Sequence, residues 1–322
     1  MSKKTVLIVG GAGFIGSHVN LALNQAGYET IVYDNLSSGK KEAVISGELI
    51  VGDMGDEAAL DALFRSRRID AVMHFAGSID VGGSVKDPAR HYINNVAKTL
   101  ILLNTMRRFN IQTLIFSSTA AIYGVPQDDF IKEEHPKNPI NPYGRSKLMI
   151  EMILSDFSLA YGLKYTSLRY FNAAGGDPMG ILKNHKDRED NLIPIILRNI
   201  LEGNDKVTIF GTDYPSRDGT CLRDYIHVMD LANAHIKALE KLFKERKSKA
   251  YNLGVGRGIT VKEVVDAVQT EIGREVTTLN GERRVGDPFR LVADGSLAAE
   301  ELEWSPKYTL KEIIHDAWKA LK

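Results

Sequence analysis

Three side chains near the middle of the sequence could together move a proton to or from a hydroxyl group. Tyr143 and Lys147 form a Y-x-x-x-K pair, and residues four apart on a helix share one face. Such pairs are common on exposed helix faces, but this one follows an apolar run that ends at the hydroxyl of Thr119. A free phenol has a pKa of about 10, and a neighbouring ammonium lowers it. We predict that Tyr143 is a general acid/base, that Lys147 tunes it, and that Thr119 positions the reacting oxygen.

A glycine-rich loop near the start of the chain has the spacing of a dinucleotide-binding turn. Gly10, Gly13 and Gly16 form the pattern G-x-x-G-x-x-G between an apolar run and a helical pattern. Glycines let the backbone approach a pyrophosphate closely, and the helix that follows offers N–H groups to it. A glycine turn without a ligand is the alternative, but the flanking strand and helix favour the binding site.

The identity of the dinucleotide is indicated by Asp34, which ends the next predicted strand 18 residues after Gly16. A carboxylate at this position accepts hydrogen bonds from ribose hydroxyls and repels a 2′-phosphate. The sequence therefore predicts NAD rather than NADP, although an Asp at a strand end also suits a simple turn. Asp53 and the run 75–77 also end predicted strands, where they could contact the adenine ring, the pyrophosphate and the ribose.

Positioning these groups requires a sheet whose strand ends meet at one edge. The apolar runs 6–9, 30–33, 49–51, 71–75, 113–116 and 166–170 alternate with the helical patterns 14–26, 56–66, 88–109 and 143–161. Continuous apolar strands between helices are buried on both faces. The pattern predicts an α/β fold, a Rossmann-type doubly wound parallel sheet.

The alternation becomes less regular after Asn172. We expect an NAD-binding domain at 1–173 and a second, smaller α/β substrate domain mainly at 174–322, with the segment 222–250 returning to the first. The later elements are predicted as helices at 192–201, 230–245 and 261–272 and from 310, with a strand at 250–253.

The composition argues against several other classes of protein. Lys+Arg and Asp+Glu are both 41, so no basic excess indicates nucleic-acid binding. The single cysteine, Cys221, allows neither an intramolecular disulfide nor a cysteine metal cage, and the eight histidines have no metal-ligand spacing. No apolar stretch approaches the roughly 18 residues of a membrane helix. We expect a cytoplasmic protein that binds no metal.

Over nearly its whole length the chain resembles the UDP-glucose 4-epimerases of the extended short-chain dehydrogenase/reductase group. The resemblance rests on the segments 10–16, 74–77, 81–85, 94–95, 116–124, 141–147, 169–172, 209–211, 223–230 and 251–254. It implies interconversion of UDP-glucose and UDP-galactose by hydride transfer from C4 to a tightly bound NAD and back to the opposite face. It also implies a homodimer that packs the helices 88–109 and 143–161 into a four-helix bundle.

The resemblance also implies the residues of both ligand sites. Those expected to contact NAD are Gly10, Gly13, Phe14, Ile15, Gly16, Asp34, Asn35, Asp53, Met54, Phe75, Ala76, Gly77, Asn95, Ser117, Tyr143, Lys147 and Tyr170. Those expected to contact the UDP-sugar are Thr119, Tyr143, Asn172, Asn191, Leu192, Ile209, Phe210, Arg223, Arg284, Asp287 and Leu291. Arginine can bind a diphosphate with two hydrogen bonds, and asparagine can read uracil or sugar groups.

Three alternatives stand beside this interpretation. A sugar-nucleotide dehydratase would carry an Asp-Glu pair after Thr119, where this chain has Ala120 and Ala121. A UDP-glucuronate 4-epimerase or decarboxylase needs a cation at the sugar carboxylate, which the sequence does not locate. A nucleotide-binding regulator that has lost catalysis would not need an intact acid/base set.

Two residues depart from the pattern of the family. Ile79 stands where many members have a basic residue that binds the NAD pyrophosphate. Leu291, at the sugar pocket, is intermediate between the aromatic side chain that favours hexoses and the small one that admits N-acetyl sugars, so UDP-N-acetylhexosamines remain candidate substrates.

Overall fold

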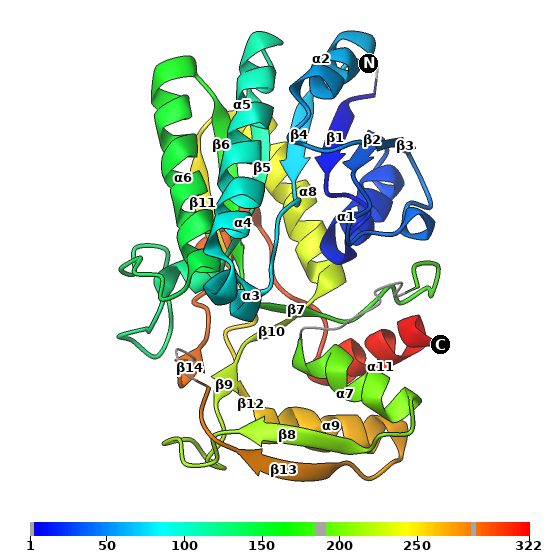
Figure 1. Cartoon of the computed structure of the whole chain (residues 1–322), viewed down its shortest axis with the longest axis vertical. Helices are drawn as coiled ribbons and strands as arrows, with labels where there is room; N and C mark the ends of the chain where they lie inside the picture. The colour runs from blue at the N-terminus through cyan, green and yellow to red at the C-terminus, as the bar shows by residue number, and fades with distance from the viewer. Residues whose placement is uncertain (1–2, 184–190, 285–287) are drawn as a thin grey trace.

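A seven-stranded parallel sheet forms the larger part of the computed structural model, which describes residues 3–183, 191–284 and 288–322 (Figure 1). The strand order is β11-β6-β5-β4-β1-β2-β3. The strands are β1 (Thr5–Val9), β2 (Glu29–Asp34), β3 (Glu48–Val51), β4 (Ala71–His74), β5 (Thr113–Thr119), β6 (Lys164–Tyr170) and β11 (Lys249–Leu253). The order reverses between β1 and β4, the kind of switch point outside which such sheets bind ligands. The predicted Rossmann-type fold is confirmed.

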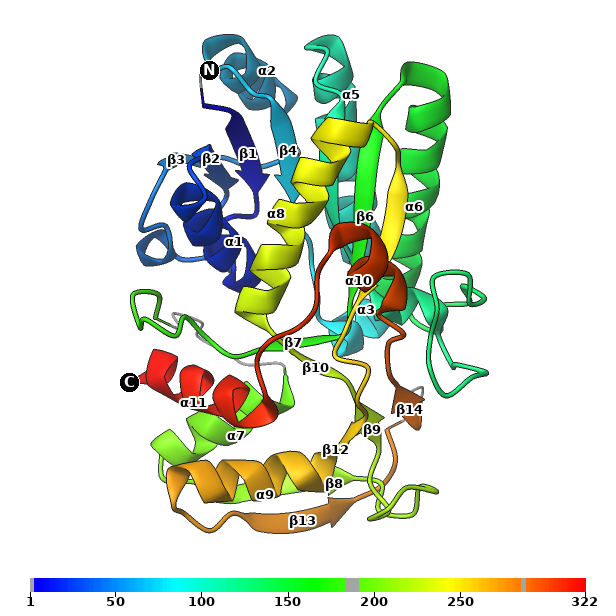
Figure 2. The same cartoon turned by 180° about the vertical axis from the view of Figure 1, so that it is seen from behind.

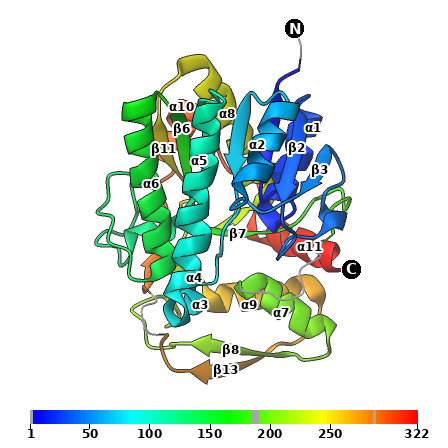
Figure 3. The same cartoon turned by 45° about the horizontal axis from the view of Figure 1, so that its top comes forward.

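Helices cover both faces of this sheet, as the view from above shows (Figure 3). One face carries α1 (Phe14–Gln25) and α8 (Val228–Glu245), which pack against each other. The other carries α2 (Glu57–Ser66), α5 (Lys98–Arg108) and α6 (Pro142–Tyr161).

The sequence of β1 explains why both faces are buried. Val6 and Ile8 join Leu239 of α8 in one hydrophobic cluster, and Leu7 and Val9 join another with Leu102 of α5. Successive strand residues point to opposite faces of the sheet. A strand whose consecutive residues are apolar therefore contributes side chains to the hydrophobic core on each face. This is the physical basis of the continuous apolar runs in the sequence.

The segment predicted as one helix at 88–109 is interrupted by a π-helical turn. It consists of α4 (Pro88–Tyr92), a π-helical turn at Ile93–Ala97 and α5. Before it lies a short helix, α3 (Val81–Lys86), which the sequence pattern did not predict. The π turn contains the buried Asn95, and such turns are frequent at functional sites.

A smaller group of elements lies beyond the carboxyl ends of the sheet strands (Figures 1 and 2). The helices α7 (Leu192–Leu201), α9 (Val261–Ile272) and α11 (Leu310–Leu321) share one hydrophobic cluster. The strands of this part are β7 (Asn172–Ala174), β8 (Lys206–Phe210), β9 (Leu222–Arg223), β10 (Tyr225–His227), β12 (Ile259–Thr260), β13 (Thr277–Gly281) and β14 (Arg290–Leu291). This is the second, smaller α/β part that the sequence predicted.

The chain crosses between the two parts more than once. After the β10 strand, α8 and β11 lie with the seven-stranded sheet, and α10 (Ser296–Leu302) packs against both of them. Among the described residues, none of the helices combines the length and the apolar character needed to span a bilayer.

Candidate active site

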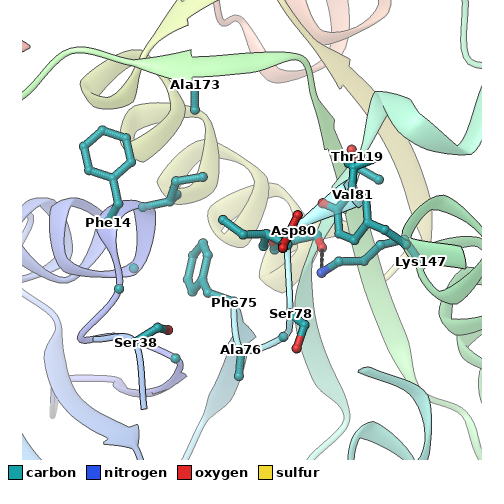
Figure 4. A pocket seen from close by; sticks show the side chains of 18 of the residues that line it. Phe14, Ser38, Phe75, Ala76, Ser78, Asp80, Val81, Thr119, Lys147 and Ala173 are labelled. Carbon is teal, nitrogen blue, oxygen red and sulfur yellow. Dashed lines mark hydrogen bonds between the residues drawn. The ribbon is translucent and has the colours of Figure 1, made fainter. Parts of the chain in front are cut away.

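The carboxyl ends of the sheet strands open into a cavity of about 1280 Å³ that both parts of the molecule line. From the sheet come the glycine loop, the residues after β2 and β4, and the end of β5. From the smaller part come Arg223 of β9 and Leu291 of β14. In Figure 4, Phe14, Phe75 and Ala76 lie around one end of this space, and Thr119 and Lys147 around the other.

The glycine loop is held tightly against the residues that follow β4. Gly10 has a φ of +82°, and a Cβ there would stand 2.4 Å from the backbone nitrogen of Ala76. The Gly10 N–H donates to the carbonyl oxygen of Tyr33 at 2.9 Å. No side chain caps α1 at its N-cap residue, Gly13. Gly13 and the first turn of α1 line the cavity, so the helix N-terminus faces it, as pyrophosphate binding requires.

Asp34 is fixed at the end of β2 by two backbone groups. One carboxylate oxygen accepts from the Ala12 N–H at 2.9 Å and the other from the Leu36 N–H at 2.8 Å. The carboxylate lines the cavity beside the glycine loop, where it can also accept from ribose hydroxyls.

Asp53 lies in a small polar cluster on the same side. It accepts from the Lys98 ammonium and from the Asn35 amide, each at 2.8 Å. Burial acts to raise the pKa of Asp53, but hydrogen bonds from Lys98, the Gly55 backbone and Asn35 together lower it. The carboxylate therefore stays charged at neutral pH.

Tyr143 lies in the first turn of α6, where Pro142 starts the helix and the Asn141 side chain accepts from the Gly144 N–H at 2.8 Å. This cap fixes the direction in which the turn presents its side chains. Burial raises the pKa of the Tyr143 phenol, and a hydrogen bond with the Thr119 side chain opposes this.

Lys147 lies one turn further along α6 and is almost completely buried. Its Nζ donates to the Ser117 carbonyl oxygen at 2.9 Å. Burial lowers the Lys147 pKa to about 8, so the amine is still mainly protonated at neutral pH. The predicted acid/base set is thus one enclosed cluster of a phenol, an ammonium and a hydroxyl.

The structure brings nearly all of the predicted cofactor residues to the cavity wall. Those that line it are Gly10, Gly13, Phe14, Ile15, Gly16, Asp34, Asn35, Asp53, Met54, Phe75, Ala76, Gly77, Ser117, Tyr143, Lys147 and Tyr170. Asn95 does not line it. Its side chain is buried behind the wall, where it accepts from the Ser78 N–H at 2.7 Å and donates to Ser146 at 3.0 Å. Asn95 therefore supports the turn after β4 from behind.

The predicted substrate residues divide into two groups. Thr119, Tyr143, Asn172, Asn191, Arg223, Arg284 and Leu291 line the cavity, and Leu192, Ile209 and Phe210 do not. Phe210 lies beneath the Arg284 guanidinium, 4.1 Å from the ring centroid, and so supports a side chain that lines the cavity. Leu192 packs beside the α7 cluster and Ile209 is buried in β8. Asp287 lies outside the described residues.

Several cavity residues were missed by the sequence analysis. Ser38 follows β2 and Asp80 precedes α3, and both line the space (Figure 4). The polar run after Asp34 could have indicated Ser38. Ile79 also lines the cavity, and Lys40, Lys86 and Arg90 are among the cations that line it as well.

The doubly wound sheet, the glycine loop and the enclosed Tyr–Lys pair define a protein of the NAD-binding, short-chain dehydrogenase type. Residues 6–254 match the NAD dependent epimerase/dehydratase family, and the chain belongs to this family.

Relatives in this family are similar along almost the entire chain. A UDP-glucose 4-epimerase of Rhizobium meliloti (strain 1021) is 46% identical over 318 residues, covering 99% of this chain and 97% of its own. The crystal structure of UDP-glucose 4-epimerase from Brucella ovis in complex with NAD is 47% identical with a TM-score of 0.94, covering 98% and 97%. That of the Bifidobacterium longum enzyme in complex with NAD+ and UDP is 36% identical with a TM-score of 0.92, covering 98% of each chain.

The close approach at Gly10 predicts that Gly10→Ala weakens NAD binding, because the added Cβ must displace the backbone of Ala76. We expect at least a roughly tenfold loss of affinity, measured as NAD bound per chain. Gly27→Ala is the matched control, since Gly27 has a similar φ of +87° but no heavy atom within 4 Å of the added Cβ. It should cost about 1 kcal/mol of stability and leave NAD binding unchanged. Retention of full NAD binding by Gly10→Ala would contradict the fit.

The burial of the ammonium predicts that Lys147→Met raises the free energy of unfolding at pH 7, by ~1–3 kcal/mol. The Lys147 pKa is about 8 when folded and about 10.4 when unfolded. Between these values the unfolded wild type binds more protons, so its stability rises with pH. The difference in the free energy of unfolding between Lys147→Met and the wild type should therefore shrink as the pH rises from about 8 to about 10.

Urea unfolding of the NAD-free proteins at several pH values measures this difference. Lys206→Met, at an exposed position on β8, is the control and should change stability little. A Lys147→Met variant less stable than the wild type at pH 7 would show that the ammonium contributes more through its hydrogen bond than its burial costs.

Proposed function

We propose that the chain is an isomerase that interconverts UDP-glucose and UDP-galactose, a UDP-glucose 4-epimerase. The observation that carries this proposal is the enclosed set of Tyr143, Lys147 and Thr119 beside the predicted NAD site. Relatives that are similar to the chain over almost its full length bear the same activity in their names. The Gly10 loop and Asp34 fit NAD, since both line the cavity and combine a helix N-terminus for a pyrophosphate with a carboxylate for ribose hydroxyls.

Bound NAD supplies the hydride acceptor and then the hydride donor. The residues of the chain handle the proton. Tyr143 removes the proton from the sugar 4-hydroxyl and returns it after the sugar has turned, and the Thr119 hydroxyl holds the same oxygen. The Lys147 ammonium stabilises the phenolate in surroundings from which water is largely excluded. The cycle consumes no external NAD.

The nucleotide half of the substrate is held by the smaller part of the molecule. Arg223 and Arg284 can each bind a diphosphate oxygen pair, and Asn172 and Asn191 can read the uracil and sugar. All four line the cavity. A sugar anchored only through its nucleotide can present either face to the hydride, as epimerisation requires. We assign 1–173 mainly to NAD binding and 174–322 mainly to substrate binding, with part of 222–250 returning to the sheet.

We further propose a cytoplasmic homodimer. The α6 helix packs beside α3, α4 and the π turn, and this group carries exposed apolar side chains: Val85, Ile93, Met149, Met152 and Leu159. Leu159 is 85% exposed and Met152 62% exposed. Such a patch on helices that bear Tyr143 suits an interface with a second copy.

The activity is tested with purified protein and no added NAD, using UDP-galactose and UDP-N-acetylgalactosamine in parallel. We expect conversion of UDP-galactose. Conversion of both substrates would mean that Leu291 admits the acetamido group. Tyr143→Phe should lower kcat by ~10²–10⁴-fold and leave bound NAD unchanged. Turnover of neither substrate, even with NAD added, would refute the proposal and favour UDP-glucuronate.

The dimer is tested by light scattering at micromolar concentration. The wild type should have twice the mass of one chain, and Met152→Glu should shift it toward the monomer, because a buried unpaired carboxylate is costly. Leu201→Glu is the control, as Leu201 is 49% exposed on α7, away from these helices. A monomeric wild type would exclude the proposed interface.

A further inference from the structure

A buried ion pair lies directly behind the acid/base set. Arg169 of β6 donates to both oxygens of Glu151 on α6, at 2.9 Å from Nε and 2.6 Å from the second nitrogen. Both side chains are at least nine-tenths buried. The Arg169 guanidinium also donates to the Tyr123 hydroxyl at 2.9 Å. The acid/base chemistry proposed above makes no use of this pair.

Glu151 lies one helical turn further along α6 than Lys147. Tyr143, Lys147 and Glu151 follow one another at intervals of four residues along α6. Lys147 donates to the Ser117 carbonyl, and the next residue, Ser118, donates its hydroxyl to Glu151 at 2.5 Å. The two side chains therefore meet consecutive residues of one strand, β5.

This spacing along the helix would let Lys147 compete with Arg169 for the Glu151 carboxylate. Residues four apart on a helix can form ion pairs, and a buried ammonium gains strongly from a carboxylate partner. Yet among the described residues no carboxylate lies within ion-pair distance of the Lys147 Nζ. Burial alone accounts for the lowered pKa of Lys147. The guanidinium of Arg169 occupies both oxygens of Glu151, the nearest acid on the helix.

We propose that Arg169 is a positioning residue that reserves the Lys147 ammonium for Tyr143 by holding both oxygens of the Glu151 carboxylate. A paired lysine would present no net positive charge to the phenol. The arginine fork is suited to this task because it satisfies a carboxylate with two parallel hydrogen bonds. This inference rests on the proposed epimerase function, since Tyr143 must act as the acid/base.

Other charged and titratable groups surround these side chains. His74 of β4 faces Lys147 and is neutral, since burial and then the Lys147 charge lower its pKa to about 3. Tyr170 of β6 interacts with Tyr143. Around Glu151 stand Tyr165 and Lys137, and Lys137 is the second cation that a released Glu151 carboxylate could reach. The experiment therefore has to distinguish Lys147 from Lys137 as the new partner.

The test is the pH dependence of kcat for UDP-galactose in the wild type, Arg169→Met, Glu151→Gln and the double variant. In Arg169→Met the acid limb of the kcat–pH profile, which reports the pKa of the Tyr143 phenol, should move to higher pH by about one unit. The value of kcat at neutral pH should fall about tenfold. Glu151→Gln should cause no upward movement. In the double variant the acid limb of the kcat–pH profile should return to within a few tenths of a pH unit of the wild type, although the double variant is less stable.

Several outcomes would overturn the inference. If Arg169→Met lowers kcat but leaves the acid limb of the pH profile at the wild-type pH, then Arg169 has only a structural role or the released Glu151 carboxylate pairs with Lys137. A double variant shifted as far as Arg169→Met would mean the same. If Arg169→Met does not fold, Arg169→Lys replaces it and should show a smaller upward shift, and no shift would overturn the inference. An inactive wild type would instead refute the proposed function, so the two failures are distinguishable.

Discussion

One enclosed positive charge, the Lys147 ammonium, constrains the whole arrangement around the cavity. A buried ammonium is stable only if its hydrogen bonds are satisfied, and here the Ser117 carbonyl at the end of β5 accepts one. This contact joins α6 to the end of β5, one turn beyond the Tyr143 phenol that hydrogen-bonds the Thr119 side chain. The geometry of the reaction centre thus follows from the register between one helix and one strand.

The sheet makes that register rigid. Its central strands are buried on both faces, because alternate side chains enter separate hydrophobic clusters. A strand held from two sides has little freedom to shift. The same packing holds the glycine loop against the residues after β4, so the predicted cofactor site and the acid/base set rest on one framework.

The sequence predicted the sheet and the main helices because these depend on local pattern, and it predicted most of the cavity residues through the resemblance to the UDP-glucose 4-epimerases. The helix predicted at 143–161 is Pro142–Tyr161 in the structure, since its cap and its apolar spacing are both local signals. The strand β13 was missed because it is almost entirely exposed and carries no apolar pattern. The strand β8 was missed although its buried Val207 and Ile209 alternate with more exposed residues. The role of Asn95 behind the cavity wall, and the stacking of Phe210 under Arg284, depend on long-range packing that single-sequence patterns do not encode. The pairing of Arg169 with Glu151 is of the same kind.

The repeated passage of the chain between its two parts has a consequence for how the protein could be divided. The strand β11 belongs to the seven-stranded sheet, and α8 and α10 pack against this sheet. In the sequence, however, these three elements come after or between strands of the smaller part. No single cut in the chain separates the two parts, because a fragment ending before α8 leaves β6 as an uncovered edge and α1 without its neighbour. The two parts are therefore not interchangeable modules, and recombination between family members would have to exchange several separate segments to replace one part.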